Sequence, residues 1–163
     1  MKNDFEPSEN VPLSAYCTLG IGGPARYFVE VKTVEEMRLA LLFATHHSLP
    51  FFILGKGSNC LFDDRGFNGI VIYNKIDFVE SSDDGLFHVG AGYSFSLLGA
   101  QTARKGWSGL EFASGIPATV GGAVFMNAGA NGRETADALH SVDFMDADGQ
   151  LQTRFKEELT FSY

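Results

Sequence analysis

The clustering of glycine is the strongest constraint that this sequence places on its own fold. The chain has 19 glycines among 163 residues, against 5 prolines, and they gather in four places instead of recurring with a fixed period. This distribution excludes collagen-like and low-complexity chains. Because glycine tolerates backbone conformations that other residues avoid, the clusters indicate places where the chain turns sharply or approaches a ligand closely.

Charge and composition exclude several classes of function. The net charge is −8 and no Lys/Arg cluster occurs, so we expect no binding to nucleic acids or to membrane surfaces. An acidic protein can still bind an anionic cofactor through backbone N–H groups. Cys17 and Cys60 have no metal-ligand spacing, which predicts reduced thiols and no metal site. Without a signal peptide or a membrane-length apolar segment, the expected location is cytoplasmic.

The first third of the chain predicts a parallel strand–helix–strand unit. Alternating residues indicate a strand over 25–31, and Thr33 followed by Glu36 is the capping box of a helix. A buried strand over 51–54 follows the helix directly. The expected inward face of the helix consists of Val34, Met37, Leu41 and Ala44.

Further elements are expected downstream, still without an internal repeat. Residues 69–73 and 86–91 are predicted to be a strand pair around an acidic turn at 81–85, and a short helix is predicted to run to Lys105. Residues 141–146 and 150–155 form an expected hairpin across Asp148-Gly149, a pair favoured in tight turns. Another strand is expected to start at 159 and to continue to 163. Together these elements indicate an α/β (α+β) fold.

The first candidate binding site is the loop after the strand at 51–54. Its two glycines allow a concave nest of N–H donors that suits pyrophosphate oxygens, although an ordinary turn between strands is the alternative. The spacing fits neither a P-loop nor the three-glycine dinucleotide fingerprint. The candidate residues are Gly55, Lys56, Gly57, Ser58 and Asn59.

The second candidate site is the small-residue stretch between residues 115 and 129. A proline-bearing turn followed by glycines could expose bare amides along a planar ligand, whereas tight packing of a short helix is the alternative. Its candidate residues are Gly115, Ile116, Pro117, Thr119, Gly121, Gly122, Ala123, Asn127, Ala128 and Gly129. Glu111 precedes this stretch and is interpreted as a structural carboxylate.

Four motifs in order resemble the UDP-N-acetylenolpyruvylglucosamine reductase (MurB) family. They are Thr-Leu-Gly-Ile-Gly-Gly-Pro-Ala at 18–25, Leu-Gly-Lys-Gly-Ser-Asn at 54–59, Gly-Leu-Glu-Phe-Ala-Ser-Gly-Ile-Pro-Ala-Thr-Val-Gly-Gly-Ala at 109–123 and Met-Asn-Ala-Gly-Ala at 126–130. The resemblance runs from about residue 11 to residue 163, and the four motifs together are far more specific than any one of them.

The resemblance implies an FAD-binding fold of the vanillyl-alcohol-oxidase/MurB type. A lead-in over residues 1–17 would precede a first FAD-binding subdomain over 18–74 and an incomplete second one over 75–163. The loop at 55–59 would contact the FAD pyrophosphate, and residues 115–130 would line the remainder of FAD, including its flavin side. The substrate-binding domain of the family is expected to be absent.

The resemblance also implies an oxidoreductase of peptidoglycan synthesis. In this reaction NADPH reduces FAD, and reduced FAD passes hydride to the enolpyruvyl group of a UDP-sugar to give UDP-N-acetylmuramate. Such a flavoprotein belongs to cell wall biogenesis and, through it, to cell shape, the cell cycle and cell division. The oligomeric state stays open.

The catalytic residues of the family are not found in this sequence. The family arginine would follow Tyr163, a candidate substrate contact, and the family's catalytic serine and glutamate lie in the substrate domain. Ala118 and Lys56 are departures from residues common in the family. We therefore expect a fragment that is inactive alone. The alternatives are an FAD-linked hydroxy-acid oxidase or dehydrogenase of the same fold, a non-catalytic flavin- or partner-binding module, and a structural domain without a ligand.

Overall fold

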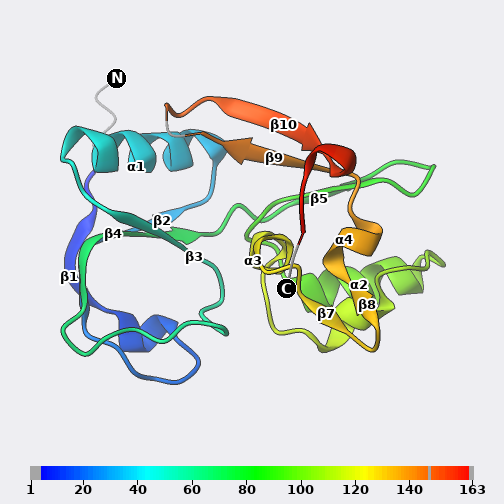
Figure 1. Ribbon diagram of the computed structural model, residues 1–163, viewed down its shortest axis with the longest axis horizontal. Coiled ribbons are helices and arrows are strands. Elements are labelled where there is room, and N and C mark those ends of the chain that lie inside the picture. The colour runs from blue at the N-terminus through cyan, green and yellow to red at the C-terminus, as the bar shows by residue number, and fades with distance from the viewer. Residues whose placement is uncertain (1–4, 147, 162–163) are drawn as a thin grey trace. The chain divides into compact units, whose positions relative to one another are not determined.

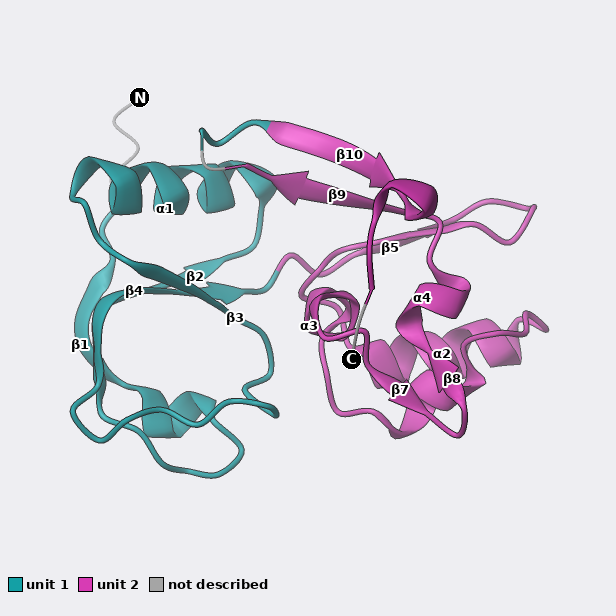
Figure 2. Cartoon of the chain, viewed as in Figure 1, with its two compact units in different colours: residues 1–75, 147–150 teal, residues 76–146, 151–163 magenta. Residues whose placement is uncertain are grey.

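The computed structural model describes residues 5–146 and 148–161. Within it the chain divides into two compact units, one of residues 1–75 with 147–150 and one of residues 76–146 with 151–163 (Figure 2). The first unit is a sheet with a helix, and the second is a set of short helices and two-stranded hairpins (Figure 1). Each unit contains one of the two candidate binding stretches.

The first unit is built on a four-stranded sheet in the order β1-β2-β4-β3. Its strands are β1 (Ser8–Pro12), β2 (Pro24–Val31), β4 (Phe67–Asn74) and β3 (Phe51–Leu54). β1 is antiparallel to β2, whereas β2 and β3 both run parallel to β4. The expected parallel unit is therefore confirmed, with β4 inserted between its two strands.

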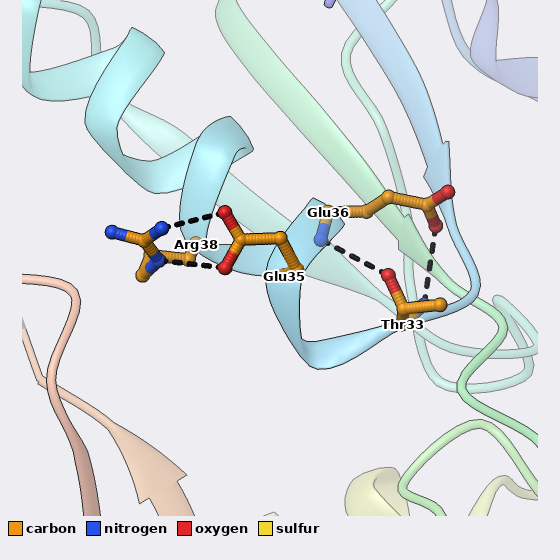
Figure 3. A network of polar contacts seen from close by, with 4 residues as sticks. All are labelled: Thr33, Glu35, Glu36 and Arg38. Atoms are coloured by element: carbon orange, nitrogen blue, oxygen red, sulfur yellow. Dashed lines mark hydrogen bonds and ion pairs between the residues drawn. The ribbon is translucent and has the colours of Figure 1, made fainter. Parts of the chain in front are cut away.

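Helix α1 (Val34–His46) connects β2 to β3 and begins at the predicted capping box. The Thr33 hydroxyl accepts from the Glu36 N–H at 3.1 Å, and the Glu36 carboxylate accepts from the Thr33 N–H at 3.1 Å (Figure 3). Each side chain thus satisfies a backbone donor that the first helical turn leaves without a partner. Met37, Leu41 and Ala44 are buried as predicted, but Val34 in the first turn is exposed.

The core of the first unit lies mainly on central strands. Ile70, Val71 and Ile72 of β4 are fully buried, as expected for a strand with a neighbour on each side. The prediction of a buried strand over 51–54 is wrong. β3 is an edge strand in which Leu54 is buried, whereas Phe51 and Ile53 are 50% and 42% exposed. A run of four apolar residues does not show that one face of the strand is left exposed to solvent.

The second unit begins with the hairpin of β5 (Val79–Ser81) and β6 (Phe87–Val89). Strands were expected over 69–73 and 86–91, but the prediction that they pair with each other is wrong. Residues 67–74 pair with β2 and β3, while β6 pairs with β5, across the acidic turn. Helix α2 (Phe95–Arg104) follows, and Gly106 adopts the left-handed φ of +85° that ends a helix.

The glycine-rich stretch of the second unit forms several short elements. In chain order they are η2 (Glu111–Gly115), α3 (Val120–Phe125), β7 (Gly129–Ala130), β8 (Arg133–Glu134) and α4 (Thr135–Ala138). Phe95, Phe112, Ala113 and Ala123 form the core beneath them. The small side chain of Ala123 lets α3 approach the two aromatic rings closely, so part of the small-residue composition serves packing.

The predicted hairpin at the C-terminal side is confirmed, with a longer loop than expected. β9 (Ser141–Met145) pairs with β10 (Leu151–Phe155), and Met145 lies opposite Leu151. The connection is therefore the stretch 146–150 and not a two-residue turn, and Gly149 has a φ of +75° within it. η3 (Lys156–Glu158) follows. Residues 159–161 form no strand, and the rest of the strand predicted there lies outside the described residues.

Candidate functional site

The loop at 55–59 follows β3 directly and is fixed by a close backbone contact. Gly57 has a left-handed φ of +66°, and a Cβ atom at this position would lie 1.9 Å from the Tyr16 carbonyl oxygen. No residue with a side chain fits there without a shift of the backbone. The glycine that sequence reasoning assigned to ligand approach is thus also required for packing against Tyr16.

Thr18 ties the first glycine-rich motif to this loop. The Thr18 N–H and hydroxyl both donate to the Gly57 carbonyl oxygen, at 3.1 Å and 3.4 Å. The motif at 18–25 and the motif at 54–59 therefore meet within the first unit, a contact that sequence reasoning missed. No periodicity indicates such a contact, because it joins residues about 40 positions apart.

Three backbone donors of this loop are not used within the described chain. In the part of the chain that the structure describes, the N–H groups of Gly55, Gly57 and Ser58 donate to no other residue. Successive free N–H groups around a left-handed residue form the kind of nest that binds anionic oxygens. Gly57 is buried while Lys56 and Asn59 are exposed, so the loop combines a fixed backbone with accessible side chains.

Most backbone N–H groups of the second candidate stretch donate to other groups of the chain, contrary to the expectation of bare amides. The N–H groups of Ile116, Ala118, Val120, Gly121 and Ala123 donate to carbonyl oxygens of Ala113, Ile116, Tyr93, Ala91 and Thr119, respectively. The Gly122 N–H donates to the Thr119 hydroxyl, which is the N-cap of α3. For this part of the stretch, backbone pairing and helix capping account for the small residues.

Packing also explains the glycine at 121. A Cβ atom there would lie 2.9 Å from the Cβ atom of Ala91. Gly115, by contrast, has nothing within 4 Å of a Cβ position, so packing does not require glycine at that site. The sequence left two interpretations open. Tight packing accounts for residues 118–123, whereas Gly115 lies on an open surface.

Residues 127–129 are held by the next helix. Asn127 has a φ of +43° and is 4% exposed, and its Oδ1 accepts from the Ala136 N–H at 3.0 Å. The Ala128 carbonyl oxygen accepts from both the N–H and the hydroxyl of Thr135, at 3.0 Å and 2.7 Å. Gly129 pairs with Glu134 in the β7–β8 ladder. Thr135 was not predicted as a site residue, since its role depends on α4 folding back onto this segment.

A pocket of about 550 Å³ opens beside this segment, entirely within the second unit. Its volume lies in the range of small-molecule sites. The lining includes Phe125, Asn127, Phe144, Arg154, Glu158 and Phe161. Only Asn127 of these belongs to the predicted set. Sequence reasoning missed Phe125, which is 88% exposed, because an apolar residue in a short helix is expected to be buried.

The charged groups near these segments have specific partners. Glu111 accepts from its own N–H and from the Gly109 N–H, and these bonds lower the pKa of its carboxyl group. This geometry agrees with the structural role predicted for Glu111. Across residues 5–146 and 148–161, no group of three His, Cys, Asp or Glu side chains could hold a metal ion. No helix among those residues is long and apolar enough to cross a membrane. Tyr163 lies outside the described residues.

Comparison with known proteins gives the family. A family model described as "FAD binding domain" matches residues 25–154. The reductase named UDP-N-acetylenolpyruvoylglucosamine reductase in Protochlamydia amoebophila is 62% identical over all of this chain and 54% of its own length. Its namesake in Chlamydia muridarum is 52% identical over 98% of this chain and 54% of its own length. The chain thus spans about half the length of the curated relatives it matches.

Solved structures agree with this result. MurB from Thermus caldophilus has a TM-score of 0.76 and 42% identity, covering 95% of this chain and 55% of its own. A VAO-type flavoprotein from Myceliophthora thermophila, at 20% identity and a TM-score of 0.62, covers 82% of this chain and 27% of its own and shows the fold alone. The expected fold class is confirmed. The chain belongs to the FAD binding domain family and corresponds to the N-terminal portion of UDP-N-acetylenolpyruvoylglucosamine reductases (MurB).

Proposed function

We propose that this chain is the FAD-binding portion of a reductase that converts UDP-N-acetylenolpyruvoylglucosamine to UDP-N-acetylmuramate with NADPH. The observation that carries the proposal is the loop at 55–59, whose free N–H groups are held in place by Tyr16 and Thr18. An acidic chain with a net charge of −8 needs such a local donor set to bind an anionic cofactor. The similarity to reductases of peptidoglycan synthesis supplies the reaction.

The residues present fit FAD in two ways. The N–H groups of Gly55, Gly57 and Ser58 suit the pyrophosphate oxygens, and Lys56 adds a positive charge to the same loop. The pocket beside Asn127 suits a flat, largely apolar ring because Phe125, Phe144 and Phe161 line it. We propose that residues 18–74 and 75–163 form the two FAD-binding subdomains.

FAD, when bound, supplies hydride transfer from NADPH to the enolpyruvyl double bond of the UDP-sugar. The described residues bind and orient the cofactor in this scheme, and none of them is assigned the role of proton donor. Tyr163 is proposed to contact the UDP-sugar substrate. The proposed cellular setting is cytoplasmic synthesis of cell-wall precursors, with its consequences for cell shape and division.

The decisive experiment is the visible absorption spectrum of the purified chain. The chain is incubated with FAD, freed of excess cofactor on a desalting column and scanned between 350 and 500 nm. A retained flavin spectrum at about one equivalent is the expected result. A colourless chain, together with no change in FAD fluorescence on titration, would reject cofactor binding by these residues. Addition of NADPH and UDP-sugar to the loaded chain then tests turnover separately, and none is expected.

A further inference from the structure

We propose that Asn127 is a hydrogen-bond donor to the ligand of the pocket in the second unit, and that α4 fixes its side chain in that role. The group it recognises is a carbonyl oxygen or ring nitrogen of a planar, uncharged heteroaromatic ligand. This inference rests on the proposed function, which places the flavin ring system at this pocket, and it adds the polarity of the contact.

The orientation of the Asn127 amide is dictated by Ala136. A backbone N–H can only donate, so the atom 3.0 Å from the Ala136 nitrogen must be the amide oxygen. The opposite orientation would place two donors against each other. The Nδ2 group of Asn127 is therefore turned away from α4.

Burial then places the Nδ2 group at the pocket. Asn127 is 4% exposed, and no described residue accepts a hydrogen bond from its Nδ2. Yet no fully buried side-chain nitrogen or oxygen among the described residues lacks a partner. Nδ2 must consequently reach solvent, and Asn127 lines the pocket. A nearly buried amide with unused donors that opens on a cavity is an arrangement that suits a ligand acceptor.

Thr135 removes the competing acceptor from the same segment. The Ala128 carbonyl oxygen already accepts two hydrogen bonds from Thr135, so both of its lone pairs are used. The Ala128 N–H donates to the Ala123 carbonyl oxygen at 2.8 Å. The Asn127–Ala128 peptide is thus fixed on both sides, and the amide of Asn127 is the polar group that this segment offers to the pocket.

The charged residues of the pocket, Arg154 and Glu158, make hydrogen bonds within their own segment. Arg154 donates to the Thr153 carbonyl oxygen at 3.2 Å and to the Gln152 side chain at 3.3 Å. Glu158 accepts from the Phe155 N–H at 2.8 Å. Apolar side chains, among them Phe125, Phe144 and Phe161, provide much of the remaining contact surface, and Asn127 offers its unused donors beside them. This combination suits a ring with an acceptor on its edge.

The test is the substitution Asn127→Asp with Asn131→Asp as its matched control. Asp at 127 can still accept from Ala136 and tolerates a left-handed φ, but it loses both donors and adds a negative charge. Asn131 has a similar φ of +57°, is exposed in the same segment and undergoes the same charge change. The probes are FAD and lumiflavin, a flavin ring system without ribityl chain or phosphates, and binding is measured by fluorescence titration.

N127D is expected to weaken binding of both probes by about 10-fold to 100-fold, because a buried acceptor loses its donor and meets a carboxylate. N131D is expected to stay within about 2-fold of the unsubstituted chain, since an exposed charge is screened. Equal affinities of N127D and N131D would overturn the inference and leave the proposed function intact. Binding of FAD but not of lumiflavin to the unsubstituted chain would have the same meaning.

A second measurement protects the test against a variant that does not fold. In the unsubstituted chain, the side-chain NH₂ resonances of Asn127 are followed by ¹⁵N NMR during addition of lumiflavin. A shift of these resonances that saturates with the binding curve is expected. Resonances that stay in place while lumiflavin binds would contradict the inference. Failure of both probes to bind the unsubstituted chain would reject the proposed function together with the inference, a pattern that no single-variant failure produces.

Discussion

Gly57 and Tyr16 are in such close contact that a Cβ atom on Gly57 would lie 1.9 Å from the Tyr16 carbonyl oxygen. Two residues farther along, Thr18 donates two bonds to the Gly57 carbonyl oxygen and joins the two glycine-rich loops of the first unit. Gly20 offers a comparison within the same unit. Its φ of +67° matches the +66° of Gly57, but nothing lies within 4 Å of a Cβ atom there.

Substitutions at Gly20 and Gly57 distinguish the energetic cost of a left-handed backbone from the cost of a steric clash. Gly20→Ala should cost only the left-handed strain, about 1 kcal/mol of unfolding free energy. Gly57→Ala adds a backbone clash and should cost about 3 kcal/mol or more, with loss of FAD binding as the loop shifts. Denaturant unfolding and FAD titration of both variants provide the measurement. Equal stabilities of the two variants would show that the Tyr16 contact is relaxed in solution.

Cys17 and Cys60 are predicted to react slowly with thiol reagents in the folded chain. The Cys17 thiol is buried and donates to the Cys60 carbonyl oxygen at 2.9 Å, and burial raises the pKa of the Cys60 thiol. Burial shields the Cys17 thiol from reagents, and the raised pKa of Cys60 lowers the amount of its reactive thiolate at neutral pH. An aromatic disulfide reagent should therefore modify both thiols of the chain rapidly in denaturant and much more slowly without it. Rapid labelling of the native chain at pH 7 would contradict the burial, and C60S would identify the reacting residue.

Local signals in the sequence predicted local structure well. Thr33 and Glu36 are three residues apart, and the capping box that they form depends on little beyond that spacing. The hairpin of β9 and β10 was found for the same reason, because its two strands are neighbours in sequence. The pairing of 69–73 could not be found this way. Its partners come from β2 and β3, and nothing in an apolar run specifies which distant strand lies beside it.

The candidate site shows the same division. The glycine spacing predicted an unusual backbone conformation in the loop at 55–59, but it did not predict that Gly57 packs against Tyr16. Asn127 was chosen for its motif, while the feature that makes its side chain useful is the bond to Ala136, nine residues away on α4. The amides of Val120 and Gly121 looked free in sequence because their acceptors, Tyr93 and Ala91, come from an earlier segment. Site chemistry depends on such tertiary contacts, which residue types alone do not encode.

Glu111 should contribute to stability in a pH-dependent way. Hydrogen bonds from its own N–H and from the Gly109 N–H lower the pKa of the Glu111 carboxyl group in the folded state. A lowered pKa favours folding above the unfolded value, near 4.5, and this contribution is lost as the pH falls through the folded value. Glu111→Gln should therefore lower the thermal midpoint at pH 7, and this effect should shrink as the pH falls below about 4.5. E157Q, at an exposed carboxylate of η3, is the control, and a pH-independent E111Q effect would argue against the ionic bond.

The capping box of α1 should outweigh the neighbouring ion pair of Glu35 and Arg38, although the ion pair has the shorter contacts (Figure 3). Thr33→Ala leaves the Glu36 N–H without its acceptor and should destabilise the first unit by about 1 kcal/mol. Glu35→Gln removes the charge that pairs with Arg38 at 2.5 Å, but both side chains are largely exposed, so solvent already screens the pair. The free energy of unfolding should therefore be unchanged in E35Q and reduced in T33A, as measured by urea unfolding followed at 222 nm. The reverse order would mean that the ion pair, and not the cap, sets the start of the helix.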